Sequence, residues 1–129
     1  MTPGTMSPLR ILTAAEALIK SPAGSSVGLW PRTAAALGRQ AIEGALRQYW
    51  HLREPGLERC STHAQLLCLV VYFRDRDLAR QTSAIWSALS RACHHHPYEL
   101  NPTADELRAW LASARAFADE VARQTDKPD

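Results

Sequence analysis

The sequence has few of the features that mark exported or membrane-spanning proteins. No apolar run approaches the roughly 20 residues that a helix needs to cross a bilayer. The N-terminal segment carries one basic residue, Arg10, and no apolar stretch followed by a small-residue cleavage site. We therefore expect a cytoplasmic protein that makes no membrane contact.

The chain also contains few cysteines and has a small net charge. The three cysteines, Cys60, Cys68 and Cys93, cannot all pair within one chain. Without an export signal we expect free thiols. The net charge of +2 is too small for the broad basic surface that is typical of nucleic-acid-binding proteins. Any anionic ligand must therefore be held by a few local side chains.

The chain of 129 residues has the length of one ordinary domain and no repeat that would indicate a solenoid. We predict a single domain over residues 7–124, with flexible tails at residues 1–6 and 125–129. Every strong periodicity inside this range is helical. No segment offers a partner for an isolated strand, so a sheet is not expected.

The first half of the chain predicts two helices. Ser7 as N-cap and Pro8 at the first helical position predict a helix to Lys20, followed by a loop over residues 21–28. A longer helix is predicted from Pro31 to about Arg53. Its apolar stripe consists of Ile42, Leu46, Tyr49 and Trp50, and the opposite, solvated face carries Arg39, Glu43 and Arg47.

The second half predicts three more helices. The third runs from about Thr62 to Phe73 after a possible cap at Ser61, and its apolar character on all sides predicts a place in the middle of the bundle. The fourth follows the charged turn at residues 74–77 and ends near Cys93. The last begins with a capping box. Together these patterns predict an all-α protein, an antiparallel bundle of four to five helices.

One short segment combines residues suited to phosphate chemistry. Arg91 falls in the last predicted turn of the fourth helix, and His94, His95 and His96 follow at its end. A guanidinium can grip two phosphate oxygens, and an imidazole takes and returns a proton near neutral pH. Because Leu89 faces the core, Arg91 should point away from it, two positions and about 200° further around the helix.

An Arg-x4-His motif, Arg91 and His96, near the junction of the last two long helices of a small bundle resembles the HEPN family (higher eukaryotes and prokaryotes nucleotide-binding domain). The resemblance extends from about the second helix to Val121. It implies a HEPN-like fold and a metal-independent endoribonuclease that acts as a homodimer, in which two copies of the motif face each other. It also implies a toxin-antitoxin or defence setting, with a nucleotidyltransferase or an antitoxin as partner.

The resemblance further implies the roles of individual residues. His96 would take the proton of an RNA 2′-hydroxyl, and Arg91 would bind the scissile phosphate, so that no metal or other cofactor is needed. Around this pair, the RNA or nucleotide would be contacted by His94, His95, Tyr98 and Asn101.

Two alternatives remain open. Many active members of the family carry a polar residue after the arginine, whereas this chain has Ala92. A non-catalytic HEPN-like module that binds a nucleotide or a protein therefore stands beside the nuclease. A zinc site is the other alternative, because the spacing of Cys60 and His63 suits a metal and Cys93 with His94 or His96 could complete four ligands. It requires the start of the third helix to meet the end of the fourth.

Overall fold

The computed structural model describes residues 6–20, 30–94 and 100–126. These residues form five α-helices and no strand, which confirms the all-α prediction. The helices are α1 (Pro8–Lys20), α2 (Trp30–Arg53), α3 (Thr62–Tyr72), α4 (Arg76–Cys93) and α5 (Ala104–Asp126), with a short 3₁₀ turn at Leu57–Arg59 before α3. α5 thus includes Thr125 and Asp126, which the sequence analysis assigned to the tail.

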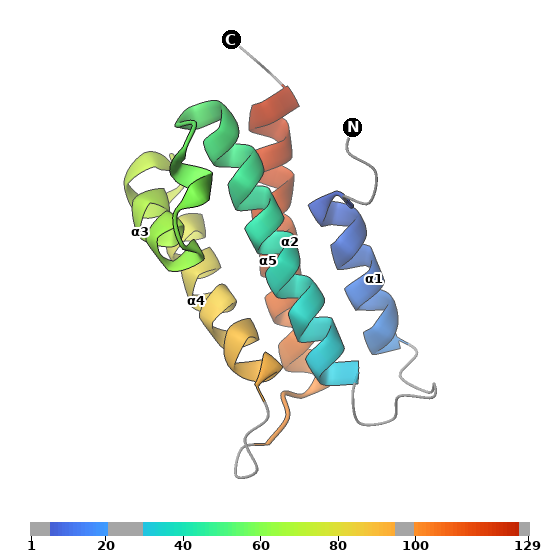
Figure 1. Cartoon of the computed structure of the whole chain (residues 1–129). Coiled ribbons are helices and arrows are strands. Elements are labelled where there is room, and N and C mark those ends of the chain that lie inside the picture. The colour runs from blue at the N-terminus through green and yellow to red at the C-terminus, as the bar shows by residue number, and fades with distance from the viewer. Residues whose placement is uncertain (1–5, 21–29, 95–99, 127–129) are drawn as a thin grey trace.

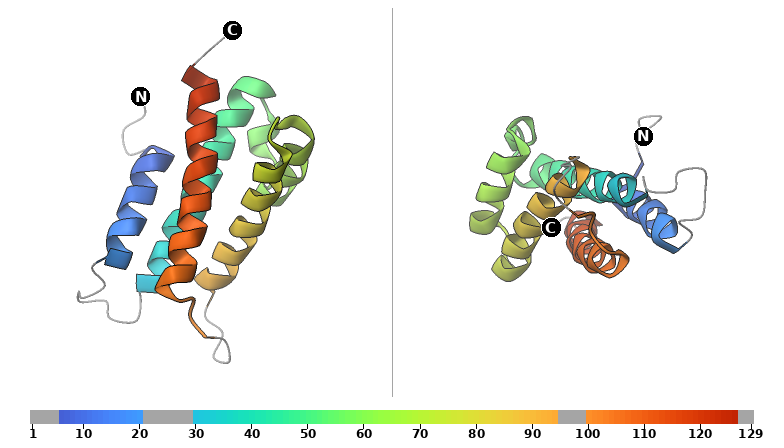
Figure 2. Two further views of the ribbon diagram at one scale, coloured as in Figure 1. Left: turned by 180° about the vertical axis from the view of Figure 1, so that it is seen from behind. Right: turned by 90° about the horizontal axis from the view of Figure 1, so that it is seen from below.

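Four of the helices form an antiparallel bundle in which successive members run in opposite directions (Figure 1). The two long helices α2 and α5 lie against each other in its middle, and α1 and α4 flank them on opposite sides (Figure 2). The end of α4 consequently lies at the same end of the bundle as the beginnings of α2 and α5 (Figure 1). None of the described helices is long and apolar enough to cross a membrane.

Local capping explains where several helices begin. The side chains of Ser7, Ser61 and Asp75 each accept a hydrogen bond from the backbone N–H three residues further on, at 3.3, 3.1 and 3.0 Å. Such bonds satisfy N–H groups that have no partner inside the helix. The caps predicted at Ser7 and Ser61 are confirmed, and Asp75 adds one. α4 therefore begins at Arg76, two residues inside the segment 74–77 that was predicted as a turn.

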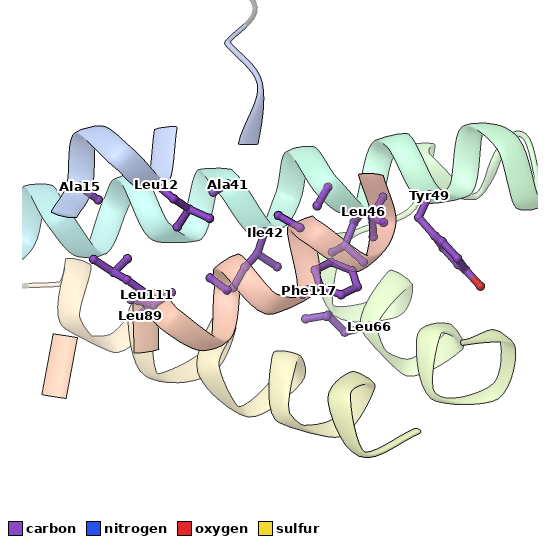
Figure 3. Packing of buried hydrophobic residues seen from close by; sticks show 14 of the residues in the cluster. Leu12, Ala15, Ala41, Ile42, Leu46, Tyr49, Leu66, Leu89, Leu111 and Phe117 are labelled. Carbon is purple, nitrogen blue, oxygen red and sulfur yellow. The ribbon is translucent and has the colours of Figure 1, made fainter. Parts of the chain in front are cut away.

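The core lies between the facing stripes of the four bundle helices. Leu12, Ile42, Leu46, Leu111 and Phe117 are buried there and point toward one another (Figure 3). Beyond them, edge-to-face and tilted ring contacts of 4.9 to 5.5 Å join aromatic side chains from α2, α3 and α5. These aromatics are Tyr49, Trp50, Tyr72, Phe73 and Phe117.

The prediction that α3 lies in the middle of the bundle is wrong. α3 packs on the outside, against α4, and only one side of it is covered (Figure 2). Leu66 and Leu69 are buried, whereas Leu67 is 63% exposed and Val71 is 73% exposed. The physical reason is that α2 and α5, each twice as long, already bury their stripes against each other and leave no central position for a short helix.

Candidate functional site

The end of α4 positions the arginine of the motif. Arg91 lies in the last turn, and the helix ends because His94 adopts an extended conformation with φ −95° and ψ 135°. The backbone N–H of His94 donates a hydrogen bond of 3.2 Å to the carbonyl oxygen of Arg91. This bond satisfies the Arg91 carbonyl and closes the last turn of α4.

Arg91 is exposed, as predicted from its position relative to the buried Leu89. Within the described ranges its guanidinium has neither a hydrogen bond nor an ion pair, unlike Arg39, Arg80, Arg108, Arg115 and Arg123. An unpaired guanidinium at a helix end can complement the helix dipole or hold an external anion. The geometry therefore leaves Arg91 free to contact a phosphate group.

The other residues of the predicted site are described only in part. His94 and Asn101 are both exposed, one at the end of α4 and one shortly before α5. His95, His96 and Tyr98 lie outside the described residues, so their roles stay predictions.

The beginning of α5, next to this site, follows the predicted capping box. The backbone N–H of Thr103 donates to Glu106 at 2.9 Å, and the N–H of Glu106 donates to the Thr103 hydroxyl at 3.1 Å. Two N–H groups at the start of α5 are therefore satisfied by its own side chains. They are not available to a ligand.

The zinc alternative fails on the placement of its ligands in the described structure. Cys93 lies beside Arg39 in the first half of α2, whereas Cys60 follows the far end of that helix. The 14 residue steps from Arg39 to Arg53 correspond to about 21 Å of helix. Among residues 6–20, 30–94 and 100–126, no group of three or more His, Cys, Asp or Glu side chains could hold a metal. The start of α3 therefore does not meet the end of α4.

A polar cluster between α2 and α4 was missed by the sequence analysis. Glu43 Oε2 accepts hydrogen bonds from Arg39 Nε at 2.9 Å and from Trp86 Nε1 at 3.1 Å. The Arg39 guanidinium also lies over the Trp86 ring, 5.5 Å from its centroid. The expectation of a solvated Arg39 and Glu43 face is wrong, because both residues are half-buried against α4. The available signal was Trp86, an indole N–H on an apolar face that needs an acceptor.

The same cluster sets the electrostatics of its charged and titratable groups. The hydrogen bond to Glu43 raises the pKa of Arg39, so this guanidinium stays charged at every pH of interest. Burial raises the pKa of the Cys93 thiol, although the nearby Arg39 and Arg32 act in the opposite direction. At neutral pH the thiol is therefore uncharged.

Comparison with protein-family models, with curated proteins and with solved structures found no match to this chain. The HEPN resemblance thus depends on the residues and the order of the helices, and it stays a prediction.

Proposed function

We propose that this protein is a HEPN-like endoribonuclease that cleaves RNA without a metal ion. The observation that carries the proposal is the exposed, unpaired guanidinium of Arg91 at the end of α4, next to His94 and close in sequence to His96. A weakly charged chain must hold an anionic ligand through a few local groups, and a free arginine suits a phosphate.

In the proposed reaction, His96 takes the proton of a ribose 2′-hydroxyl, whose oxygen attacks the adjacent phosphorus. The bond to the 5′-oxygen breaks, and that oxygen leaves as a hydroxyl after it receives a proton. A 2′,3′-cyclic phosphate remains on the other product. Arg91 binds the non-bridging oxygens and stabilises the charge that develops on them. His94, His95, Tyr98 and Asn101 contact the neighbouring ribose or base.

The active form in this proposal is a homodimer that brings two Arg91–His96 pairs to one cleft, and a nucleotidyltransferase or an antitoxin is the proposed partner. Light scattering at micromolar concentration tests the dimer. A dimer is expected, and a monomer at all concentrations would contradict a shared cleft.

A non-catalytic module that binds a nucleotide or a protein is the second candidate. Ala92 favours it, because this half-buried methyl group offers no hydrogen bond next to Arg91. Calorimetry with nucleotides distinguishes the two candidates. Binding without cleavage supports the module, and the absence of both ligand and partner contradicts it.

Cleavage is tested by incubating RNA with the protein in the presence of a chelator. Wild type should produce cyclic-phosphate ends, and Arg91→Ala and His96→Ala should each lower the rate at least about 100-fold, a typical loss for such groups. Arg80→Ala is the matched control, because Arg80 is also exposed on α4 but is paired with Asp77 at 3.5 Å. If wild type and all three variants leave the RNA uncleaved, the proposed nuclease activity is refuted.

A further inference from the structure

The outer face of α3 is apolar and uncovered. Six large apolar side chains of the described residues are exposed, and three of them, Leu67, Val71 and Tyr72, lie on this helix of 11 residues. α3 is the outermost helix on its side of the bundle, and no described helix packs over this face (Figure 2). Single exposed apolar residues are common, but a group of them on one short helix indicates an interaction surface.

The same face carries no charge. No Asp, Glu, Lys or Arg occurs between Cys60 and Phe73. α3 also has no acidic residue in its first turn and no basic residue in its last turn. The face therefore offers nothing that attracts a charged partner, and two copies of it do not repel each other. By contrast, the other four helices all carry exposed charged side chains, among them Arg10, Arg47, Arg80 and Arg108.

We propose that this face binds the same face of a second copy of the chain. Such a contact is self-complementary when a two-fold axis relates the two copies. Leu67 is the middle residue of α3, so an axis at Leu67, perpendicular to the helix, pairs the two helices over their full length. The helices then run antiparallel, and each polarised helix end lies beside the opposite end of its partner. Val70 of each copy opposes Ala64 of the other, so the contact is apolar on both sides of the axis.

The size of the face determines the strength of this contact. The exposed side chains of α3 present on the order of 300 Å² of apolar surface. A standard interface buries about 800 Å² on each partner, so this contact belongs to the small, weak class. We expect a dissociation constant on the order of 100 μM or weaker. The contact consequently forms at high protein concentration and is open at a few micromolar.

The contact goes beyond the proposed function, because it lies away from Arg91. Three residues join α3 to the start of α4, and α3 is about 16 Å long. Arg91 lies about 22 Å from the start of α4, beyond the part of that helix that α3 can cover. Association through α3 is therefore separate from a cleft shared by two Arg91–His96 pairs, and neither contact requires the other.

Sedimentation equilibrium of the full chain between about 5 μM and about 1 mM tests the proposal. The weight-average mass of wild type should rise by about one half or more over this range. Leu67→Glu places two like charges in the middle of the apolar contact and should abolish the rise. Because Leu67 already contacts water and glutamate has a similar helix propensity, the variant should melt within about 3 °C of wild type at the lowest concentration. A variant that melts far lower would place Leu67 inside the fold and overturn the proposal.

Two further variants control this experiment. Leu100→Glu is the matched control, because Leu100 is 98% exposed outside α3, and it should leave the rise in mass unchanged. Leu67→Lys should fail to associate by itself. An equimolar mixture of Leu67→Lys and Leu67→Glu should associate, because the two-fold axis brings position 67 of one copy against position 67 of the other. Failure of the mixture, or loss of the rise in Leu100→Glu, would overturn the proposal.

RNA cleavage at a few micromolar separates this inference from the proposed function. Leu67→Glu should cleave RNA at the wild-type rate, because the α3 contact is open at that concentration. If RNA is cleaved but the mass of wild type does not rise, the inference fails and the nuclease stands. If the mass rises in a Leu67-dependent way but no RNA is cleaved, the nuclease fails and the α3 contact stands. Wild type that does not self-associate but co-sediments with vesicles of phosphatidylcholine and phosphatidylserine would overturn the second copy in favour of a membrane surface.

Discussion

The indole nitrogen of Trp86 on α4 donates a hydrogen bond of 3.1 Å to Glu43 on α2, across 43 positions of sequence. The same carboxylate oxygen accepts from Arg39, whose guanidinium covers the Trp86 ring. This contact joins α2 to α4, the helix that carries Arg91 in its last turn. It therefore helps to position the candidate site as well as to stabilise the fold.

We expect Glu43→Ala to lower the free energy of unfolding by about 1 to 2 kcal/mol, because it leaves the half-buried donors of Arg39 and Trp86 without an acceptor. Glu120→Ala is the control. Glu120 pairs with Arg123 and Gln124 within α5 alone, so its loss should cost about 0.5 kcal/mol or less. Urea unfolding measures both. Equal losses of unfolding free energy would mean that the hydrogen bonds of Glu43 contribute no more to stability than an ion pair on the surface.

Substitution of two glycines of α2 by alanine should change the free energy of unfolding in opposite directions. A Cβ at Gly38 would lie 2.7 Å from Leu111 Cδ2 and 3.2 Å from Leu89 Cδ1, and both leucines are fully buried. The resulting overpacking costs about 1 to 3 kcal/mol, which exceeds the gain in helix propensity of about 0.5 to 1 kcal/mol. A Cβ at Gly44 would meet only Pro8 Cγ at 3.4 Å and the guanidinium nitrogen of a flexible arginine side chain at 3.6 Å.

Urea unfolding should therefore show a lower stability for Gly38→Ala and a rise of about 0.5 to 1 kcal/mol for Gly44→Ala. Stabilisation by both variants would mean that α2 can move away from α5 and α4 at little cost. Close approach of these helices at Gly38 would then not be a determinant of the fold.

The features that the sequence predicted are those set by near neighbours in the chain. The caps at Ser7 and Ser61 and the box of Thr103 and Glu106 depend on residues three positions apart, and all three are present. The exposure of Arg91 followed from its helical phase relative to Leu89. These interactions need no knowledge of which helices meet.

The features that the sequence did not predict depend on which helices meet. The apolar pattern of α3 was compatible with either a central or an outer position, and competition with the longer α2 and α5 decided the outcome. The charged series at Arg39 and Glu43 resembled a solvated face, because the partner Trp86 comes from another helix.

The three cysteines should differ in their reaction with iodoacetamide. Cys60 is exposed, whereas Cys68 and Cys93 are half-buried. Burial raises the pKa of Cys93, and the thiolate is the reactive form, so Cys93 should react more slowly than Cys60 at pH 8. Because this pKa is raised in the folded state, the stability contributed by the protonated thiol is lost as pH rises through the folded pKa.

Peptide mapping by mass spectrometry measures the three rates. In urea they should converge, which is the control for intrinsic differences between the cysteines. Faster labelling of Cys93 than of Cys60 in the folded protein would show that Arg32 and Arg39 outweigh burial at this thiol.

Leu66 and Leu67 are adjacent in α3, and their substitution by alanine should change the free energy of unfolding by very different amounts. Leu66 is 2% exposed and Leu67 is 63% exposed. Leu66→Ala should lower the free energy of unfolding by about 2 to 5 kcal/mol, through lost apolar burial and the cavity that remains. Leu67→Ala should change it by about 0.5 kcal/mol or less, because the side chain already contacts water in the folded monomer.

Urea unfolding at low and at high protein concentration checks this pair of variants. The small effect of Leu67→Ala at low concentration follows from the outer position of α3. A loss at Leu67 that is comparable with the loss at Leu66, and that persists at the lowest concentration, would contradict that position. It would restore the central position that the apolar pattern of α3 predicted, and the packing of α2 against α5 would have to be reconsidered with it.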